Sequence, residues 1–589
     1  MSDINAGDAV LRVLEQWGVP RIYGLPGGSF DSMMNAIHDE RERIDFIQVR
    51  HEEAGALAAA AEAKLTGRIG VCFGSSGPGA VHLLNGLYDA REDGVPVLAL
   101  VGEVPQQQMN IDFFQAMDEE PIFTDVAVFC RTATNAQGLP ALVDEAVRRA
   151  YKFHGVSVII IPKDLAWAQI DDRPVATAAN FRRPLPQAPH QDLIEEAAKL
   201  IGEAKAPLLY FGLGAREARE ELIEMSEKFK MPLVSTFPAK GIVEDDYPAY
   251  LQSAGRVATK TANEAIYTAD LTIWVGSDNP FGSMFVAPHT KVIQIDTDGA
   301  KLGKRFQPNV TLAIQADAKL TLRAIIEAGD RREESVFYRA CLRSKRNWDD
   351  WVASFNEDDS TPLRPEPIYH IINEQLDDED ILLPDVGNVD IDFLRLAKLK
   401  PTNRWAVSGK HATMGFAVPA ALAAKLEFPD STVYSLNGDG GFAMLCEEVL
   451  AQLKYHAPVI NVVFSNHSLG FIEAEQRDDS HQPLSGVDLP DTDWAKVAEG
   501  FGAVGFTVRT VEEARQAFAQ AKQADRASVI DVKMTGASPL DVRYMKFPET
   551  TKDPAEVEEF VKTYQAGALK SLAFWIGQET RQGGPEGAR

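Results

Sequence analysis

Cysteines, basic residues and long hydrophobic runs are all scarce in this 589-residue sequence. Its four cysteines are widely spaced and form no CxxC pair, which argues against a disulfide framework and a thiolate zinc site. Lysine and arginine number 59 against 86 aspartates and glutamates, a net charge of −27 that repels nucleic acid and anionic lipid. The longest apolar runs, such as 95–101 and 156–161, are too short to span a membrane, and the acidic N-terminus does not resemble a secretory signal. We therefore expect a cytoplasmic protein that binds neither nucleic acid nor membrane.

Length and composition favour a globular protein of several domains. Hydrophobic residues make up 45% and charged residues 25% of the chain, and this length corresponds to about three or four domains. Proline clusters at 183–189 and 361–367 are suitable linkers, because proline continues neither a helix nor a central strand. Between them, short apolar runs alternate with alanine-rich helical stretches, which predicts parallel sheets covered by helices on both faces. We expect three α/β domains and a C-terminal tail, at residues 1–182, 190–345, 360–565 and 566–589.

The first and third pieces contain the same sequence unit. A glycine turn at Gly77 leads through a helix and a short loop to Pro96, Val97 and a strand, and Gly438 leads in the same way to Pro458 and Val459. This repetition predicts a duplicated domain with a different domain inserted between the copies.

Polar residues follow two expected strands of the third piece. Gly438-Asp439-Gly440-Gly441 follows the strand 431–436, and Asn466 follows the strand 459–465, 27 residues after Asp439. Parallel strands bring their carboxyl ends to one edge of the sheet, where such folds bind ligands. Carboxylate and amide oxygens suit Mg²⁺, and the glycines allow phosphate to approach the start of the next helix. The alternative is a glycine turn and an asparagine in an unrelated loop.

Two further patterns leave their interpretation open. In His51-Glu52-Glu53 the acidic residues alone are typical of a helix N-terminus, where they favour the helix dipole. In the middle piece, Gly212-Leu213-Gly214 closes a strand and acidic residues close others, which suits the pyrophosphate and ribose of a dinucleotide. Glu217 occupies the place of the third glycine, so an inert structural domain is an equal alternative.

Taken together, these motifs resemble those of thiamine-diphosphate enzymes. The spacing of GDG and asparagine matches their diphosphate motif, and 412–416 (ATMGF) is similar to the segment that bends the cofactor. Longer stretches, including YGLPGGSFDSMM at 23–34 and STFPAKGIVEDDYPAYLQSAGRVATKTANEA at 235–265, resemble the bacterial pyruvate oxidase family, and the resemblance runs from about residue 8 to about residue 565. It implies a pyrimidine-binding, an FAD-binding and a diphosphate-binding domain, and a homodimer or homotetramer with active sites at subunit interfaces.

The resemblance also implies a role for particular residues. Glu52 would hydrogen-bond the aminopyrimidine ring, Met414 would wedge between the two cofactor rings, and the Ala412 carbonyl would hold the exocyclic amine. Thiamine diphosphate would be bound by Asn388, Val389, Ala412, Met414, Asp439, Gly440, Gly441, Ser468, Leu469 and Gly470. Mg²⁺ would be bound by Asp439, Asn466 and the carbonyl of Ser468. FAD would be bound by Gly212, Gly214, Ala215, Thr236, Lys240, Ser253, Arg256, Val257, Ser277, Asn279, Asp296, Asp298, Asp317 and Ala318. The reacting pocket would contain Glu52, Gly28, Ser29, His82, Phe114, Gln115, Phe471 and Glu475.

The activity implied by the resemblance is oxidative decarboxylation of pyruvate with phosphate and O2. The products would be acetyl phosphate, CO2 and H2O2, formed through a thiamine-diphosphate enamine that is oxidised by FAD. A pyruvate:quinone oxidoreductase that releases acetate, a non-redox acetolactate synthase and a non-catalytic scaffold remain alternatives. Lys410, His411 and residues 102–108 depart from the family pattern, which leaves the preferred 2-keto acid open.

The C-terminal tail bears on the choice between oxygen and quinone. Leu569, Leu572, Ala573 and Ile576 form a helical stripe, but the preceding turns are rich in glutamate. A basic face would be needed to bind anionic lipid, so we expect this stripe to pack onto the protein's own surface.

Overall fold

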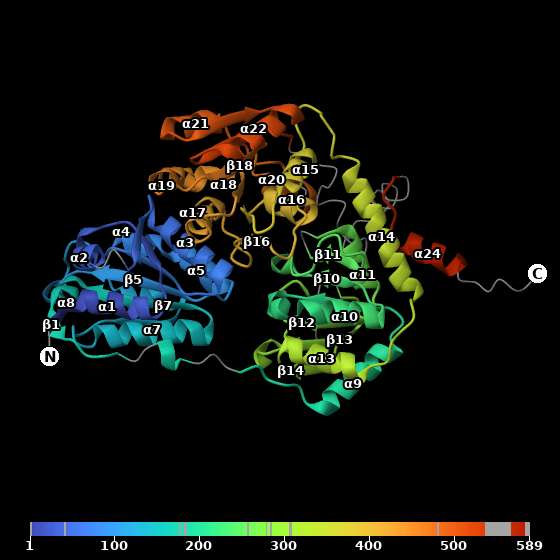
Figure 1. Ribbon diagram of the computed structural model, residues 1–589, viewed down its shortest axis with the longest axis horizontal. Helices are drawn as coiled ribbons and strands as arrows, with labels where there is room; N and C mark the ends of the chain where they lie inside the picture. Colours follow the sequence, from blue (N-terminus) through green and yellow to red (C-terminus); the bar gives the residue numbers. More distant parts are fainter. Residues whose placement is uncertain are drawn as a thin grey trace, which may run out of the picture.

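The computed structural model contains three six-stranded parallel sheets, arranged as three α/β bodies (Figure 1). The structure describes residues 3–39, 43–175, 178–181, 185–255, 258–278, 280–282, 286–305, 309–479, 482–535 and 567–582. One sheet lies in each of the three expected domains, and every strand pair within the three sheets is parallel. The predicted α/β class is therefore confirmed.

The first sheet has the order β3-β2-β4-β5-β7-β6. Its strands are β2 (Arg21–Gly24), β3 (Asp45–Gln48), β4 (Gly70–Gly74), β5 (Val97–Glu103), β6 (Ala127–Thr132) and β7 (Val156–Pro162). The central strands β4, β5 and β7 are buried at every residue, which explains their uninterrupted apolar sequences. Helices α1 (Ala6–Gln16), α2 (Asp31–Asp39) and α7 (Leu139–Phe153) cover one face, and α3 (Glu52–Thr66) and α5 (Leu84–Glu92) cover the other.

The third sheet repeats the topology of the first. Its strands are β15 (Ile381–Pro384), β16 (Arg404–Trp405), β17 (Val433–Gly438), β18 (Val459–Ser465), β19 (Val504–Val508) and β20 (Ser528–Lys533). They are ordered β16-β15-β17-β18-β20-β19. When each sheet is numbered from its own first strand, both read 2-1-3-4-6-5. The predicted duplication is thus confirmed by strand order.

The middle sheet has a different order, 3-2-1-4-5-6 in its own numbering. Its strands are β9 (Pro207–Phe211), β10 (Leu233–Ser235), β11 (Tyr250–Ser253), β12 (Leu271–Val275), β13 (Lys291–Asp296) and β14 (Val310–Gln315). This is the order of dinucleotide-binding sheets, whose ligand lies where the chain reverses its direction of strand addition. Here that point falls between β9 and β12. The topology favours cofactor binding over an inert domain.

The remaining elements complete the layers. A two-stranded antiparallel sheet pairs β1 (Asp3–Asn5) with β8 (Gln169–Asp171). The other helices of the first and middle domains are α4 (Pro78–His82), α6 (Glu119–Phe123), α8 (Lys163–Trp167), α9 (Gln191–Glu203), α10 (Arg219–Phe229), α11 (Lys260–Thr268), α13 (Ala318–Ala328) and α14 (Val336–Ala353). Those that follow are α15 (Pro365–Gln375), α16 (Asn388–Leu396), α17 (Ala417–Glu427), α18 (Asp439–Leu445), α19 (Val449–Lys454), α20 (Gly470–Ala474), α21 (Trp494–Phe501), α22 (Val511–Gln523) and α24 (Leu572–Gln582).

The first and third domains pack directly on each other through α3 and α17. Both helices are rich in alanine, and small side chains let helix backbones approach closely. Arg21 of β2 strengthens the contact, because its guanidinium is 2.9 Å from both Glu62 of α3 and Glu427 of α17. This packing fixes the third domain relative to the start of α3.

The tail packs on the protein, as expected. Leu569 and Leu572 are buried, and Ile576 is packed beside the core cluster that includes α14, whereas Ala573 is exposed. Glu579 is buried between Arg339 and Arg343 of α14, at 2.7 and 2.6 Å. None of the described helices has the length and apolar character needed to cross a membrane.

Candidate active site

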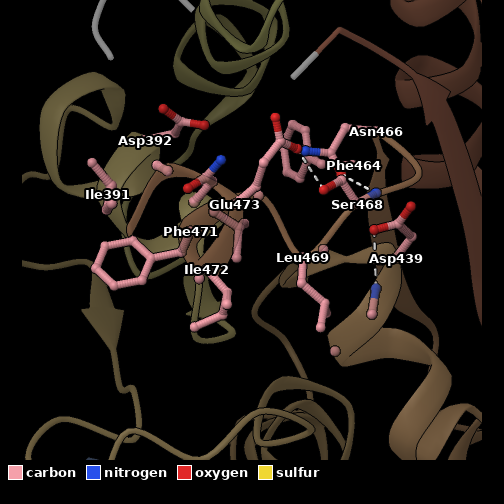
Figure 2. A pocket seen from close by; sticks show the side chains of 18 of the residues that line it. Ile391, Asp392, Asp439, Phe464, Asn466, Ser468, Leu469, Phe471, Ile472 and Glu473 are labelled. Atoms are coloured by element: carbon pink, nitrogen blue, oxygen red, sulfur yellow. Dashed lines mark hydrogen bonds between the residues drawn. The ribbon is translucent and has the colours of Figure 1, made fainter. Parts of the chain in front are cut away.

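A cavity of about 350 Å³ opens at the carboxyl ends of β17 and β18 (Figure 2). All the residues expected to bind thiamine diphosphate and Mg²⁺ meet there. The cavity is lined by Asn388, Val389, Ala412, Met414, Asp439, Gly440, Gly441, Asn466, Ser468, Leu469, Gly470 and Phe471, among others. Glu475 is outside the lining, one residue beyond Ala474. The structure therefore assembles one compact site from segments far apart in the sequence.

Asp439 and Asn466 lie together on one side of this cavity, beside Ser468 (Figure 2). Asp439 begins α18, and its carboxylate accepts hydrogen bonds from the backbone N–H of His467 at 2.8 Å and of Gly440 at 3.0 Å. Burial nevertheless raises the pKa of Asp439, so the charged carboxylate lacks full compensation from the protein. A carboxylate and an amide oxygen in this setting fit the ligand preference of Mg²⁺.

Three of the glycines around the cavity have no room for a side chain. A Cβ on Gly440 would lie 2.8 Å from Leu469, on Gly441 2.5 Å from the carboxylate of Asp385, and on Gly470 2.5 Å from Asn388. Gly440 and Gly441 line the cavity at the start of α18, where a backbone without side chains lets a ligand approach closely and a helix N-terminus favours phosphate. The cradle thus fits a diphosphate group.

Asp385 is a site residue that the sequence reasoning missed. It is fully buried, and its carboxylate accepts hydrogen bonds from the backbone N–H of Gly415 at 3.0 Å and of Phe416 at 3.3 Å. Burial raises its pKa to about 7. Asp385 thereby holds the turn that follows Met414, where Gly415 has a positive φ of 88°. The sequence does contain a signal for Asp385, because this acidic residue directly follows the strand 381–384, just as Asp439 directly follows β17.

Glu52 lies in a second cluster, in the first domain. It is the first residue of α3, is buried, and its Oε2 is 2.9 Å from Nδ1 of His82. The ring of His82 stacks on that of His51, with centroids 4.3 Å apart. A Cβ on Gly79 would lie 3.0 Å from Oε1 of Glu52, so the glycine turn closes tightly over this carboxylate.

The other first-domain candidates surround the same glycine turn. Ser29 Oγ accepts a hydrogen bond from Ser76 N–H at 2.7 Å, and Gly28 precedes it in a short 3₁₀ turn. A Cβ on Gly77 would lie 3.2 Å from Gln115, whose φ is 61°. Phe114 is 78% exposed, which argues against a core-packing role.

The two clusters do not form one site within the chain. In the part of the chain that the structure describes, the cavity lining comes from residues between 365 and 535, so Glu52 is outside it. In the described chain the cavity and the Glu52 cluster are therefore two separate groups of residues.

Glu448 is a second residue that sequence reasoning missed. It is fully buried in the 3₁₀ turn η7 (Cys446–Glu448), and it accepts hydrogen bonds from the backbone N–H of Arg50 at 2.6 Å and of His51 at 3.1 Å. Burial raises its pKa to about 7. This carboxylate connects the third domain to the residues directly before Glu52. No local sequence signal identifies it, because its partners are about 400 residues away.

In the middle domain, a glycine cradle lies at the point where the strand order reverses. A Cβ on Gly212 would lie 2.5 Å from the carbonyl of Gly276, and one on Gly214 would lie 2.7 Å from the Gly276 backbone. Next to them the Ser277 hydroxyl is buried and has no hydrogen-bond partner among the residues that the structure describes. The closely packed glycine backbone and the unbonded hydroxyl of Ser277 at this point are suited to bind the pyrophosphate of a dinucleotide.

Some of the residues expected to bind flavin make contacts within the protein. Asp298 and Asp317 cap helical turns, accepting hydrogen bonds from Ala300 and Leu320 N–H at 3.0 Å each. Lys240 forms a buried ion pair with Asp245 at 2.7 Å. The remaining described candidates are placed as follows: Ala215 is buried beside the glycine cradle, Thr236 and Ser253 are joined by a 3.3 Å hydrogen bond, Asp296 is buried at the end of β13, and Ala318 begins α13. Arg256, Val257 and Asn279 are outside the described residues.

Comparisons with known proteins agree with this arrangement. Residues 4–122 match the thiamine pyrophosphate enzyme N-terminal TPP binding domain, residues 194–325 the central domain, and residues 385–532 the C-terminal TPP binding domain. The chain is 45% identical to a pyruvate oxidase of Lactiplantibacillus plantarum, over 98% of this chain and 96% of the relative. It is 39% identical to the thiamine pyrophosphate-containing protein YdaP of Bacillus subtilis, over 92% and 93%. A protein of Methanocaldococcus jannaschii named as an acetolactate synthase large subunit is 30% identical, over 91% and 93%.

The chain therefore belongs to the thiamine pyrophosphate enzymes, with their three domains in order. Within this family it is a pyruvate oxidase-like enzyme, an oxidoreductase. Membership implies thiamine diphosphate, Mg²⁺ and FAD as cofactors. The glycine cradle at the start of α18, the Asp439–Asn466 pair and the Gly212 cradle fit these three groups respectively.

Proposed function

We propose that this enzyme oxidises pyruvate with phosphate and O2. The reaction consumes pyruvate, hydrogen phosphate, O2 and one proton, and it yields acetyl phosphate, CO2 and H2O2. The observation that supports it most is the 45% identity to a pyruvate oxidase along nearly the whole chain. The dinucleotide-type middle sheet, with its glycine cradle, gives an oxidoreductase the place it needs for FAD.

The chain's residues bind and orient the first cofactor. Asp439, Asn466 and the Ser468 carbonyl would hold Mg²⁺ against the diphosphate, and Met414 and Ala412 would shape the pocket for the rings. When bound, thiamine diphosphate supplies the nucleophilic carbon that adds to a 2-keto acid, and FAD accepts the electron pair. Glu52 would share a proton with the aminopyrimidine ring. Because His82 engages its Oε2, the Oε1 atom is the one available for that proton.

Phe114 and Gln115 would line the pocket on the side of the flavin. Their loop lies beside the glycine turn at Gly77 and presents Phe114 to the exterior. An exposed phenylalanine next to the Glu52 cluster is suited to contact with a second copy of the chain. We propose that the enzyme is a homodimer or homotetramer in which Glu52 of one subunit completes the cavity of another, and that it works in the cytoplasm.

The decisive experiment measures products from the purified holoenzyme. Protein loaded with thiamine diphosphate, Mg²⁺ and FAD is mixed with pyruvate in air, with and without phosphate, and peroxide, acetyl phosphate, acetate and acetolactate are assayed. We expect peroxide and acetyl phosphate in equal amounts, with turnover that depends on phosphate. Acetate released with a quinone acceptor, or acetolactate formed without flavin bleaching, would replace this proposal by the corresponding alternative.

A further inference from the structure

Ala412 has a backbone conformation that its own sequence does not favour. Its φ is 57°, in the left-handed region that residues with a side chain rarely adopt. Ala412 lines the cavity together with Met414. Something outside the segment must hold it in place, because an isolated chain would relax to a right-handed or extended conformation.

Both neighbours of Ala412 are bound by one side chain, that of Asn85 in α5. Its Nδ2 donates a hydrogen bond to Thr413 Oγ1 at 2.8 Å, and its Oδ1 is 2.9 Å from His411 Nε2. Asn85 Nδ2 also donates to Glu53 Oε1 at 2.7 Å. A single amide from the first domain therefore clamps the residues before and after Ala412.

The partners determine how this amide is oriented. A carboxylate only accepts hydrogen bonds, so the nitrogen of Asn85 must face Glu53 and its oxygen must face His411. His411 then carries a proton on Nε2. The ring of His411 also stacks near Tyr88 of α5, with centroids 5.8 Å apart. Both polar atoms of the Asn85 amide therefore make hydrogen bonds, which leaves little conformational freedom for residues 411–413.

The adjoining residues are held by the same face of the first domain. Asp93 accepts hydrogen bonds from the backbone N–H of Gly409 at 3.0 Å and of Lys410 at 2.9 Å. The Lys410 ammonium pairs with Glu92 of α5 at 2.5 Å. Lys410 and His411, which depart from the family pattern, thus face α5 and do not line the cavity. They belong to the support of the site.

We propose that Asn85 is a positioning residue of the thiamine site. With Glu53 as its anchor, it fixes Ala412 in the left-handed conformation and so aims the Ala412 carbonyl into the cavity, where the cofactor's exocyclic amine would bind. This inference rests on the proposed assignment of Ala412. It also gives the two adjacent glutamates separate tasks: Glu52 would meet a cofactor, and Glu53 supports the segment that meets one.

The test uses a pair of substitutions. Asn85→Asp replaces the amide donor by a carboxylate that faces Glu53, so the two repel each other and the clamp opens. Adding Glu53→Gln supplies a new donor to the carboxylate introduced at position 85 and should close the clamp again. Asn347→Asp is the matched control. Asn347 likewise uses both ends of its amide, donating to the Ala568 carbonyl at 2.9 Å and accepting from the Lys570 N–H at 2.7 Å, but it lies outside the cavity lining.

Thiamine diphosphate binding to the Mg²⁺-loaded, FAD-containing apoenzyme is measured by calorimetry, together with flavin content and the thermal midpoint. We expect Asn85→Asp to weaken binding about tenfold, equivalent to one lost charge-assisted hydrogen bond, with flavin content unchanged. The double variant should recover at least half of that loss on a logarithmic scale, and Asn347→Asp should bind like wild type.

Affinity of Asn85→Asp within twofold of wild type would overturn the inference, and so would failure of the double variant to recover at an unchanged thermal midpoint. If Asn85→Asp does not fold, Thr413→Val decides, since it removes one link of the clamp; normal cofactor affinity in that variant would count against the clamp. Failure of the wild-type protein to bind thiamine diphosphate would instead contradict the cofactor assignment itself.

Discussion

Glu448 makes stability depend on pH in a way that one substitution can isolate. The carboxyl is fully buried and accepts hydrogen bonds from Arg50 and His51 N–H. Its other oxygen, Oε2, has no hydrogen-bond partner within the described part of the chain. Burial raises the pKa from 4.5 to about 7, against the opposing effect of the two backbone donors. Glu448→Gln keeps an oxygen that can accept both bonds and removes the titration.

The size of the effect follows from the two pKa values. Below pH 4.5 the carboxyl is protonated in the folded and unfolded protein and contributes no pH dependence. Between pH 4.5 and about 7 it ionises in the unfolded chain but keeps its proton in the folded one, so the folded state loses stability as pH rises. The loss amounts to about 3 kcal/mol at 1.36 kcal/mol for each pKa unit. If the third domain melts as a unit of its size, this corresponds to roughly 6–12 °C in its midpoint.

The assay is thermal unfolding of the cofactor-free protein at several pH values from 4.5 to 8. The difference between the thermal midpoints of wild type and Glu448→Gln should decrease by roughly 6–12 °C from pH 4.5 to pH 8. The other titrating groups are the same in both proteins, so their effects cancel in this difference. Glu447→Gln is the matched control, since it removes the same charge from the adjacent residue. Two curves that stay parallel for wild type and Glu448→Gln would refute the argument, because they would show that Glu448 does not change its pKa on folding.

Three other outcomes are expected. Glu52→Gln keeps the size of the side chain but removes its proton, so exchange of the thiamine C2 proton should slow by orders of magnitude in a folded enzyme; an unchanged exchange rate would remove Glu52 from the mechanism. Asp439→Ala removes an anionic ligand from Mg²⁺ while FAD occupies another domain, so calorimetry should show weak thiamine diphosphate binding with flavin retained. Affinity within twofold of wild type would show that the metal assignment is wrong. Because α24 is packed on α14 through Leu572 and Glu579, the enzyme should not co-sediment with anionic liposomes in the presence of pyruvate. Co-sedimentation together with faster turnover on a ubiquinone analogue than on oxygen would favour the quinone alternative.

Features that depend on a few consecutive residues were predictable from the sequence. The buried strands read as apolar runs, and the GDG turn and Asn466 stand directly after strands, so their meeting at one sheet edge follows from parallel topology. The repeated unit in the first and third pieces predicted a shared fold, and the strand orders agree.

The residues that support the site were not predictable in this way. Asn85 and Glu448 contact segments more than 300 residues away in the sequence. Their role appears only when the first and third domains pack on each other through α3 and α17. Lys410 and His411 were visible as departures from a pattern, but only the structure shows that they pair with Glu92 and Asn85. The role of an acidic residue at a strand end also could not be read from the sequence. A carboxylate such as that of Asp317 can cap a helix as well as bind a ribose.

The duplicated topology gives the first and third domains equivalent sheet edges. In the first sheet β4 and β5 occupy the places that β17 and β18 occupy in the third. The third domain uses this edge for Asp439 and Asn466. At the equivalent edge of the first domain lie the Gly77–Gly79 turn, after β4, and Glu103, the last residue of β5. Glu103 and Glu119 are both buried there, and burial together with the charge of Glu103 raises the pKa of Glu119 to about 9.

The two edges thus differ in the chemistry that they favour. The third-domain edge presents carboxylate and amide oxygens together with helix N–H groups, which suit a metal and a diphosphate. The first-domain edge combines Glu52 with two carboxyls whose pKa values are raised, so it is suited to the end of a cofactor that exchanges protons. In the described chain the cavity lining comes from the third domain and does not include Glu52. Two chains related by a twofold axis would pair each edge with its complement, which is the physical reason to expect a dimer as the smallest active unit.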